Sequence, residues 1–422
     1  MEKRFYDERE AMPAEERQRY FEGRLREAVS YAYKNAPAMK KKFDQAGVEP
    51  STIRSIKDLE KLPITRKGDL LRLEKENPPF GGLLGVPKEA IKMTLVHPGP
   101  FYFPLLFEEE RMKAAAAELY AMGIRKGNVV LITFTATFGF ARALEEAVAQ
   151  LGALPVPAGP GSTDVQIETM RQMGVNSYIG SISFLINIIK RAEEQGFNFR
   201  RDFKLREVIS AAEVLPLSER IRLERDYSLS IADFYGAIEA GTVGYNCSEK
   251  SGFHTPLDKV IEIVDTETGK QLGPGETGEV VVTTFSKALP LIRFGLSDLS
   301  YYLEELCPCG RTSGRLAGVI GRIGEIAKVR GVLILPHQVE RTISAFAVVS
   351  AFQAEVSRPA QRDHIAFKIE LKDDTVNREE LAESLKEEFM KVSRVRLDRV
   401  EFVPQGTIPP ERKTIVDVRK WD

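Results

Sequence analysis

Cysteine, histidine and tryptophan are scarce in this 422-residue chain, which holds 3 Cys, 4 His and 1 Trp. Three cysteines cannot form the disulfide framework of a small secreted domain. Lys and Arg number 60 against 61 Asp and Glu, and the net charge of −1 argues against a broad electrostatic surface for nucleic acid or anionic lipid. No apolar run approaches the ~18 residues of a membrane-spanning helix. The charged stretch 1–17 lacks the apolar core of a signal peptide. We therefore expect a cytoplasmic protein that binds neither nucleic acid nor membrane.

The chain also lacks internal repeats and low-complexity tracts. Its hydrophobic share of 43% and charged share of 29% are ordinary for a globular protein. At this length two or three domains are expected. What remains is a multidomain enzyme or binding protein.

Helical and short apolar segments alternate through the first half of the sequence. Helices are expected over 15–46, 108–122, 140–151 and 164–173, and strands over 129–134, 153–157, 177–179, 205–209 and 230–234. Repeated helix-then-strand order predicts a parallel α/β sheet.

Two further regions have a different pattern. Residues 259–305 are β-rich and interrupted by glycine turns, which predicts an antiparallel subdomain. After the glycine-punctuated stretch 321–324, strands over 347–356, 364–371 and 395–403 and a helix over 377–391 predict a small α+β domain. We expect an N-terminal domain over 1–322 and a C-terminal domain over 323–422.

All three cysteines and one of the four histidines flank the β-rich region. Cys247 and His254 precede it, and Cys307 and Cys309 follow its main strands. Three thiolates and one imidazole form a closed tetrahedral zinc set, which is structural because no position is left for water. The alternative is three buried thiols that act as small apolar groups. We predict a structural zinc subdomain over about 245–312.

Three motifs occur in an informative order. They are Asp-Phe-Tyr-Gly-Ala-Ile-Glu at 233–239, Pro-Leu-Ile-Arg-Phe-Gly-Leu-Ser-Asp at 290–298 and Cys-Pro-Cys-Gly-Arg-Thr at 307–312. Together with the entry segment 42–65, they resemble the phenylacetate–CoA ligase family of the adenylate-forming (AMP-forming) acyl-CoA synthetase superfamily. The resemblance covers nearly the whole chain.

The resemblance implies an α/β fold and a two-step reaction. The fold is a large N-terminal domain of α/β sheets with a β-rich subdomain, followed by a small mobile α+β C-terminal domain. An aryl or small carboxylic acid attacks ATP to give an acyl-adenylate and pyrophosphate, and the thiol of coenzyme A then displaces AMP. ATP, AMP, Mg²⁺ and coenzyme A are the implied cofactors, and a homodimer is the implied assembly.

The same resemblance implies residues for the adenine and the metal. Tyr235, within the segment that also holds Phe234 and Gly236, would stack on adenine, with Asp233 beside the exocyclic amine. Glu239 would hold Mg²⁺ and act in catalysis. The alternative for this segment is a strand-to-helix turn followed by a surface glutamate.

Further residues follow for the ribose and the adenine side. Asp298 would accept both ribose hydroxyls, a use of its two acceptor oxygens, and Arg322 would reach the same sugar. Glu213 would line the adenine side. The alternatives are a turn aspartate, a solvated arginine and a helix-start glutamate.

For the acid and the catalytic lysine the resemblance implies other positions. Phe138, Phe140 and Ala237 would line the substrate pocket, although core aromatics would fit the two phenylalanines equally well. Lys413 would bridge the substrate carboxylate and the α-phosphate, with Arg412 as the alternative.

The stretch 94–103 departs from the family pattern. A loop rich in Ser, Thr and Gly is expected there to cradle the ATP phosphates, but this segment has one glycine and two prolines, and proline has no N–H to donate. His97 could substitute as a donor, or be a turn histidine. Gly324 also replaces an acidic hinge residue. Two alternatives to the ligase therefore stay open: a degenerate nucleotide- or acyl-adenylate-binding protein with weak or no ligase activity, and an adenylating enzyme with another acceptor.

Overall fold

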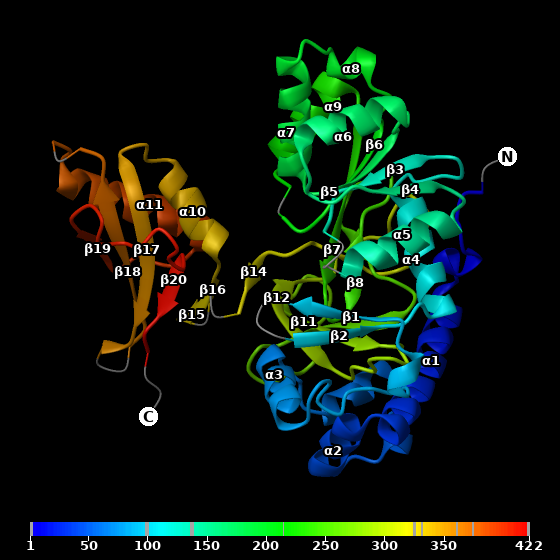
Figure 1. Ribbon diagram of the computed structural model, residues 1–422. Helices are drawn as coiled ribbons and strands as arrows, with labels where there is room; N and C mark the ends of the chain where they lie inside the picture. The colour runs from blue at the N-terminus through cyan, green and yellow to red at the C-terminus, as the bar shows by residue number, and fades with distance from the viewer. Residues whose placement is uncertain are drawn as a thin grey trace. The chain divides into compact units, whose positions relative to one another are not determined.

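The computed structural model describes residues 3–97, 101–135, 139–213, 215–323, 326–330, 332–359, 362–373 and 375–419. The chain forms two compact units (Figure 1). The first contains Met1–Leu296 and Ser300–Gly318, and the second contains Ser297–Leu299 and Val319–Asp422. No helix among the described residues is both long and apolar enough to cross a membrane.

An eight-stranded sheet forms the centre of the first unit, in the order β13-β9-β8-β7-β6-β5-β3-β4. Its strands are β3 (Val129–Ile132), β4 (Leu154–Pro157), β5 (Ser177–Gly180), β6 (Glu207–Ser210), β7 (Ser230–Ala237), β8 (Gly241–Tyr245), β9 (Phe253–His254) and β13 (Arg315–Leu316). All neighbouring pairs from β4 to β7 are parallel, which confirms the predicted parallel α/β architecture. The strands β8, β9 and β13 continue the sheet in antiparallel pairs.

Helices cover both faces of this sheet (Figure 1). They are α4 (Glu109–Ala121), α5 (Gly139–Gln150), α6 (Thr163–Gln172), α7 (Ile182–Glu194), α8 (Phe199–Asp202) and α9 (Leu217–Tyr227). Alternation along the strands assigns the faces: Ile209 packs with residues of α4 and α5, whereas Val208 packs with residues of α6, α7 and α9. The central strands β3, β5 and β6 are therefore buried on both sides, as in other parallel sheets, whereas the edge strand β4 is partly exposed.

A second sheet has the order β10-β11-β12-β14. Its strands are β10 (Lys259–Val264), β11 (Gly278–Thr284), β12 (Phe294–Ser300) and β14 (Gly321–Arg322). The antiparallel pairing of β10 with β11 agrees with the β-rich pattern of the sequence.

The N-terminal region is a helical layer with one hairpin. It contains η1 (Glu8–Ala11), α1 (Ala14–Asn35), α2 (Pro37–Ala46), η2 (Pro50–Thr52), η3 (Ile56–Lys61), α3 (Lys67–Glu76), η4 (Lys88–Ala90), β1 (Met93–His97) and β2 (Phe101–Leu105). The single helix predicted over 15–46 is wrong, because Pro37 has no N–H to continue α1 and instead starts α2 as its first residue.

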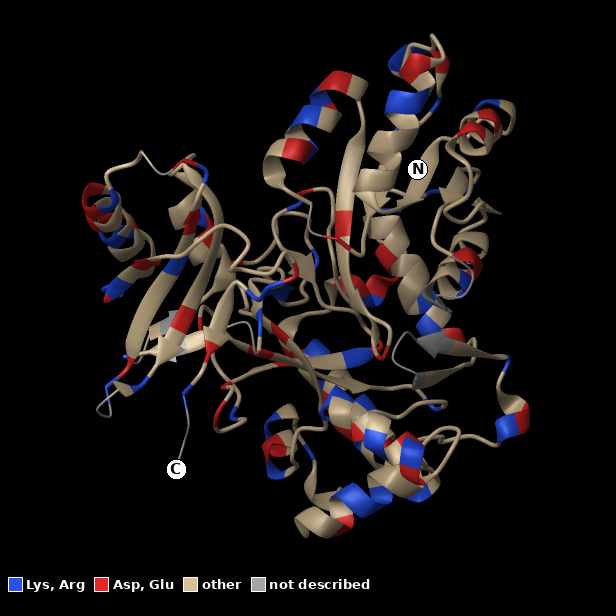
Figure 2. Ribbon diagram, turned by 60° about the vertical axis from the view of Figure 1, so that its left-hand side comes forward, with Lys and Arg blue, Asp and Glu red and all other residues tan. Residues whose placement is uncertain are grey.

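The second unit is a small α+β domain. It contains β15 (Ala327–Val329), β16 (Val332–Ile334), α10 (Pro336–Ser344), β17 (Val349–Ser357), β18 (His364–Leu371), α11 (Arg378–Ser393), β19 (Arg399–Phe402) and β20 (Ile415–Asp417). A sheet in the order β19-β18-β17-β20 shares its core with both helices. Lys/Arg and Asp/Glu are interspersed along the helices of both units, as the near-zero net charge predicts (Figure 2).

Candidate functional site

Two polar side chains come together where the parallel pairing of β6 with β7 ends, at the last residue of β6 and midway along β7. Ser210 and Asp233 are register partners of parallel strands, so both side chains point to the same face of the sheet. Ser210 Oγ and Asp233 Oδ1 are buried and have no hydrogen-bond partner among the described residues. Burial raises the pKa of Asp233 to about 7. Unsatisfied buried acceptors at the strand ends of an open α/β sheet indicate a place for a ligand donor.

The segment after Asp233 changes register against β8. A β-bulge lies between Tyr235 and Gly236, a device that turns side chains beside functional sites. Tyr235 is half-buried against an apolar cluster that includes Val243 and Val280. Phe234 is buried in the core, so only its backbone is available to a ligand, whereas Gly236 is exposed.

Glu213 follows β6 and has a structural partner. Its Oε1 accepts hydrogen bonds from Ser183 N (2.6 Å) and Ser183 Oγ (2.9 Å) at the start of α7. The preceding Ala212 adopts φ 70°, a left-handed conformation that costs a non-glycine residue about 1 kcal/mol. The carboxylate therefore helps to cap α7, where a negative charge is favourable.

Glu239 lies just beyond the end of β7, which includes the half-buried Ala237. Its side chain is only 8% exposed, and Lys67 Nζ of α3 lies 3.3 Å from its Oε1. A small cavity of about 60 Å³ adjoins Glu239 and is also lined by Leu95, Phe103 and Ile238. Lys67 is a partner that the sequence motif did not reveal.

Asp298 and Arg322 lie together within the second unit. They are register partners of β12 and β14, and Arg322 Nε donates to Asp298 Oδ1 at 2.7 Å. Asp298 is 5% exposed, whereas the Arg322 side chain is 66% exposed. The structure therefore pairs two residues that the sequence assigned to the same sugar.

Lys413 is exposed on the segment that leads into β20. The backbone of this segment is fixed on both sides. Gln353 Nε2 donates to the Lys413 carbonyl (3.1 Å), and Glu370 accepts from Ile408 N (2.6 Å) and Gly406 N (3.1 Å). The hydrogen bond from Ile408 N lowers the pKa of Glu370, which keeps it charged.

The four candidate metal ligands converge. The ligand atoms of Cys247, His254, Cys307 and Cys309 all lie within 4.8 Å of one another, and all four residues are buried. Cys247 Sγ is 3.6 Å from Cys307 Sγ, and Cys309 Sγ is 3.5 Å from His254 Nε2. Zinc bonds of about 2.3 Å to sulfur and about 2.0 Å to nitrogen in a tetrahedron place two sulfurs roughly 3.8 Å apart and a sulfur and a nitrogen roughly 3.5 Å apart, so the donor set fits zinc.

Neighbouring groups orient these ligands. Ser313 Oγ is 2.8 Å from His254 Nδ1, which leaves Nε2 toward the thiols. The Cys247 thiol hydrogen-bonds to Cys309 and lowers its pKa. Arg311 Nε donates to Glu10 Oε2 at 2.6 Å in a buried ion pair that connects the cluster to the N-terminal segment.

Some predicted positions lie outside the described residues. They are Phe138, the side chains of Phe140 and His97, the centre of the 94–103 segment at Pro98–Pro100, and the hinge residue Gly324. The described parts of the 94–103 segment are strands of the β1–β2 hairpin.

Comparison with known proteins gives consistent matches. The family model "AMP-binding enzyme C-terminal domain" matches residues 331–419. A phenylacetate–coenzyme A ligase of Thermus thermophilus is 27% identical over 451 residues, which cover 99% of this chain and 100% of that protein. A phenylacetate–coenzyme A ligase of Aromatoleum evansii is 30% identical, with 82% of this chain and 80% of that protein covered.

A solved structure extends the likeness to the fold. An open conformation of 2-hydroxyisobutyryl-CoA ligase, crystallised with its acyl-AMP (2-HIB-AMP) and CoA, superposes with a TM-score of 0.86. The sequence identity is 24%, and the superposition covers 97% of this chain and 93% of that one.

Proposed function

Because this chain belongs to the phenylacetate–coenzyme A ligase family, we propose that it is an AMP-forming acid–thiol ligase. A carboxylate oxygen of the acid attacks the α-phosphorus of ATP and pyrophosphate leaves. The thiolate of coenzyme A then attacks the acyl carbonyl, and AMP leaves. The observation that carries the proposal is the buried acceptor Asp233 Oδ1 without a partner, at the strand end that also presents Tyr235.

Adenine recognition follows from this strand end. The exocyclic amine of adenine is a donor, and Asp233 Oδ1 is the acceptor that lacks one. Tyr235 supplies the aromatic face, re-aimed by the bulge at Gly236. Phe234 contributes backbone only, because its ring belongs to the core. Glu213 supports the site through α7 rather than through contact with the nucleotide.

We assign the sugar and the phosphate to Asp298, Arg322 and Lys413. Asp298 accepts the two ribose hydroxyls, and Arg322 holds this carboxylate in position through its 2.7 Å hydrogen bond. Lys413 stabilises the negative charge that develops between the acid and the α-phosphate. We further propose that the functional boundary between a 1–322 body and a 323–422 cap lies in the glycine-containing stretch 321–324.

Two metal ions fit the residues present. Glu239 offers one carboxylate for Mg²⁺, which neutralises phosphate charge, and typically needs only one or two protein carboxylates besides phosphates and water. Lys67, whose Nζ lies 3.3 Å from Glu239 Oε1, is the neighbour with which such an ion would share this carboxylate. Cys247, His254, Cys307 and Cys309 hold a structural zinc, which joins the 247–254 and 307–309 segments.

The cavity beside Glu239 favours a short acid over an aryl acid. An engineered cavity of about 150 Å³ is needed to hold benzene, and this one measures about 60 Å³. Aliphatic side chains that include Leu95, Leu105 and Ile238 form part of its wall, and polar residues that include Arg111, Thr284 and Ser286 form another part. We therefore assign the acid as a short aliphatic one. A cytoplasmic location and a homodimeric state remain predictions from the sequence.

The test is a pyrophosphate-release screen over short-chain and aryl acids, with and without coenzyme A. We expect ATP-dependent release with acids of about two to four carbons and weaker release with phenylacetate. Leu105→Ala, which widens the cavity, should shift the preference towards phenylacetate. Release without thioester formation would indicate another acceptor. Tight AMP binding with no release for any acid would support the nucleotide-binding alternative instead.

A further inference from the structure

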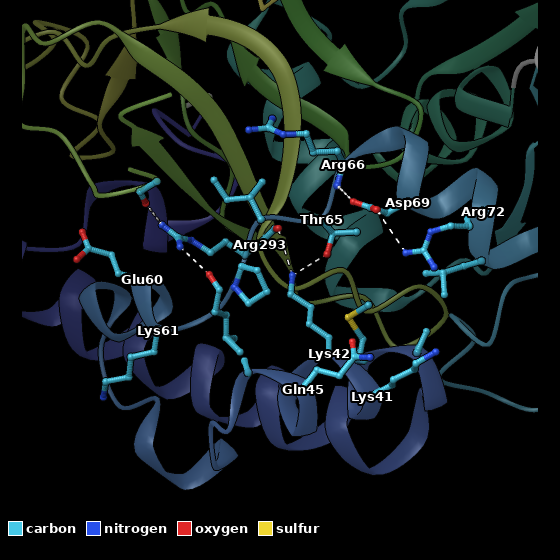
Figure 3. A pocket seen from close by; sticks show the side chains of 18 of the residues that line it. Lys41, Lys42, Gln45, Glu60, Lys61, Thr65, Arg66, Asp69, Arg72 and Arg293 are labelled. Atoms are coloured by element: carbon cyan, nitrogen blue, oxygen red, sulfur yellow. Dashed lines mark hydrogen bonds and ion pairs between the residues drawn. The ribbon is translucent and has the colours of Figure 1, made fainter. Parts of the chain in front are cut away.

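A much larger cavity lies in the first unit, in the helical layer. It measures about 840 Å³ and opens between α2, α3 and the turn at Thr266–Gly269 (Figure 3). Among the described residues, none of those assigned to adenylate formation lines it. This volume lies in the range of small-molecule and cofactor sites.

A buried ammonium group forms part of the wall. Lys42 is 9% exposed, and its Nζ donates to Thr65 Oγ1 (2.7 Å) and to the carbonyl oxygens of Ile292 (2.5 Å) and Arg293 (3.4 Å). All three acceptors are neutral, and the carboxylates of Glu262 and Asp69 act on Lys42 only through longer-range electrostatic attraction. Burial and the neighbouring Arg293 charge lower the pKa of Lys42 to about 7. A buried lysine normally has a carboxylate partner, and this one has none in direct contact.

Most of the other cations that line the cavity are neutralised. Six Lys or Arg side chains line it, and four of them are ion-paired: Lys61 with Asp58, Arg66 with Glu279, Arg72 with Asp69 and Glu76, and Arg293 with Glu262. Arg293 is buried beside Lys42, and its Nε lies 3.3 Å from Glu262 Oε1. Figure 3 shows Lys42 directed toward Thr65 and Arg293, with Lys41 nearby and Arg72 on the α3 side. Lys41 is exposed and has no described partner. Among the described residues, the lining cations without a carboxylate partner in direct contact are therefore Lys42 in the wall and Lys41 on α2.

We propose that this cavity is a second binding site, distinct from the adenylate site, for a small molecule that carries phosphate groups. Its anionic groups compensate the charge of Lys42 in the cavity wall and contact Lys41 at the rim. Ionic hydrogen bonds of this type are stronger than neutral ones because both partners leave water together. Two sources share the chemistry: the 3′,5′-ADP part of coenzyme A, and free pyrophosphate.

The proposal is tested by calorimetry on the full chain, titrated separately with 3′,5′-ADP and inorganic pyrophosphate. Saturating AMP is present to block the adenylate site, and no turnover is measured, so the result does not depend on ligase activity. We expect one equivalent of at least one probe to bind. Binding of 3′,5′-ADP alone identifies the nucleotide part of coenzyme A as the ligand, and binding of both probes identifies a general phosphate site.

Three variants on α2 make the test specific. Lys41→Ala and Lys42→Met remove the rim and the buried charge, and each should weaken binding about tenfold or more. Lys40→Ala is the matched control, because Lys40 pairs with Asp44 and does not line the cavity. Lys41 is exposed, so its variant remains informative even if Lys42→Met fails to fold. Absence of binding for both probes, or equal affinity in Lys41→Ala and wild type, would overturn the proposal.

Discussion

Removal of zinc is expected to lower the free energy of unfolding and the melting temperature of the first unit. The size of the effect follows from the number of residues between the zinc ligands. The metal joins Cys247 to Cys307, which lie 60 residues apart. Closing a loop of that length lowers the entropy of the unfolded chain, and by the relation used for disulfides the cross-link contributes about 4 kcal/mol. For a unit of roughly 300 residues, unfolding entropy is about 0.6 kcal/mol per kelvin, so the melting temperature should fall by roughly 6–7 °C.

The assay combines metal analysis with differential scanning calorimetry. Protein from zinc-supplemented medium should contain one zinc per chain, and a strong chelator should lower the first-unit transition by the stated amount. Cys309→Ser supplies the control, because it has already lost a ligand and should show no further drop with chelator. Metal-free protein that melts at the same temperature with and without chelator would refute the zinc assignment and leave three buried thiols.

Three further predictions concern the nucleotide and the lysine segment. Asp298→Ala should weaken AMP binding about 100-fold or more, since two charge-assisted hydrogen bonds are lost, and 2′-deoxy-AMP should show a smaller loss in this variant than in wild type. AMP affinity of the wild type should rise between pH 6 and 8, because the pKa of Asp233 is about 7 and the amine donor of adenine favours the ionised carboxylate. Asp233→Asn should flatten this pH profile. An unchanged slope in the variant would contradict the contact with adenine. Glu370→Gln should slow adenylation about tenfold and leave thioester formation from supplied acyl-adenylate unchanged. Lys413→Ala should likewise slow only the adenylation step. Equal slowing of both half-reactions would indicate a general folding defect.

The raised pKa of Asp233 also determines the direction in which this residue's contribution to folding stability changes with pH. Its carboxyl holds a proton in the folded state up to about pH 7, whereas an unfolded aspartate releases it near 3.8. The folded state therefore binds more protons between these values, and its contribution to stability falls as pH rises from about 4 to 7. Asp233→Asn should remove this component of the pH dependence in urea unfolding.

Several features of the fold and the candidate site could be predicted from the sequence. The alternation of helices with short apolar runs predicted that the strands from β3 to β7 are parallel, because buried parallel strands have a distinctive composition. The order of the strands in the sheet was not predicted. The scarcity of cysteine made its clustering informative, and the four ligand atoms do converge. Asp298 and Arg322, taken from separate motifs, are direct neighbours.

Other features of the site are tertiary contacts that no local sequence pattern predicts. The ion pair between Glu10 and Arg311 joins residues 301 positions apart, and the Lys67 contact with Glu239 depends on how α3 packs. Glu213 fits a motif, yet its carboxylate is used at the start of α7, a tertiary contact that the motif does not encode. Glu370 is the penultimate residue of β18, and nothing in the sequence indicates that it holds the segment before Lys413.

The central claim, that this chain forms an acyl-adenylate, is tested most directly by exchange of labelled pyrophosphate into ATP. Reversal of the first half-reaction should give exchange that requires both ATP and a short carboxylic acid, needs no coenzyme A, and is lost in Lys413→Ala. Folded, zinc-loaded protein that binds AMP but shows no acid-dependent exchange across the panel would contradict the account.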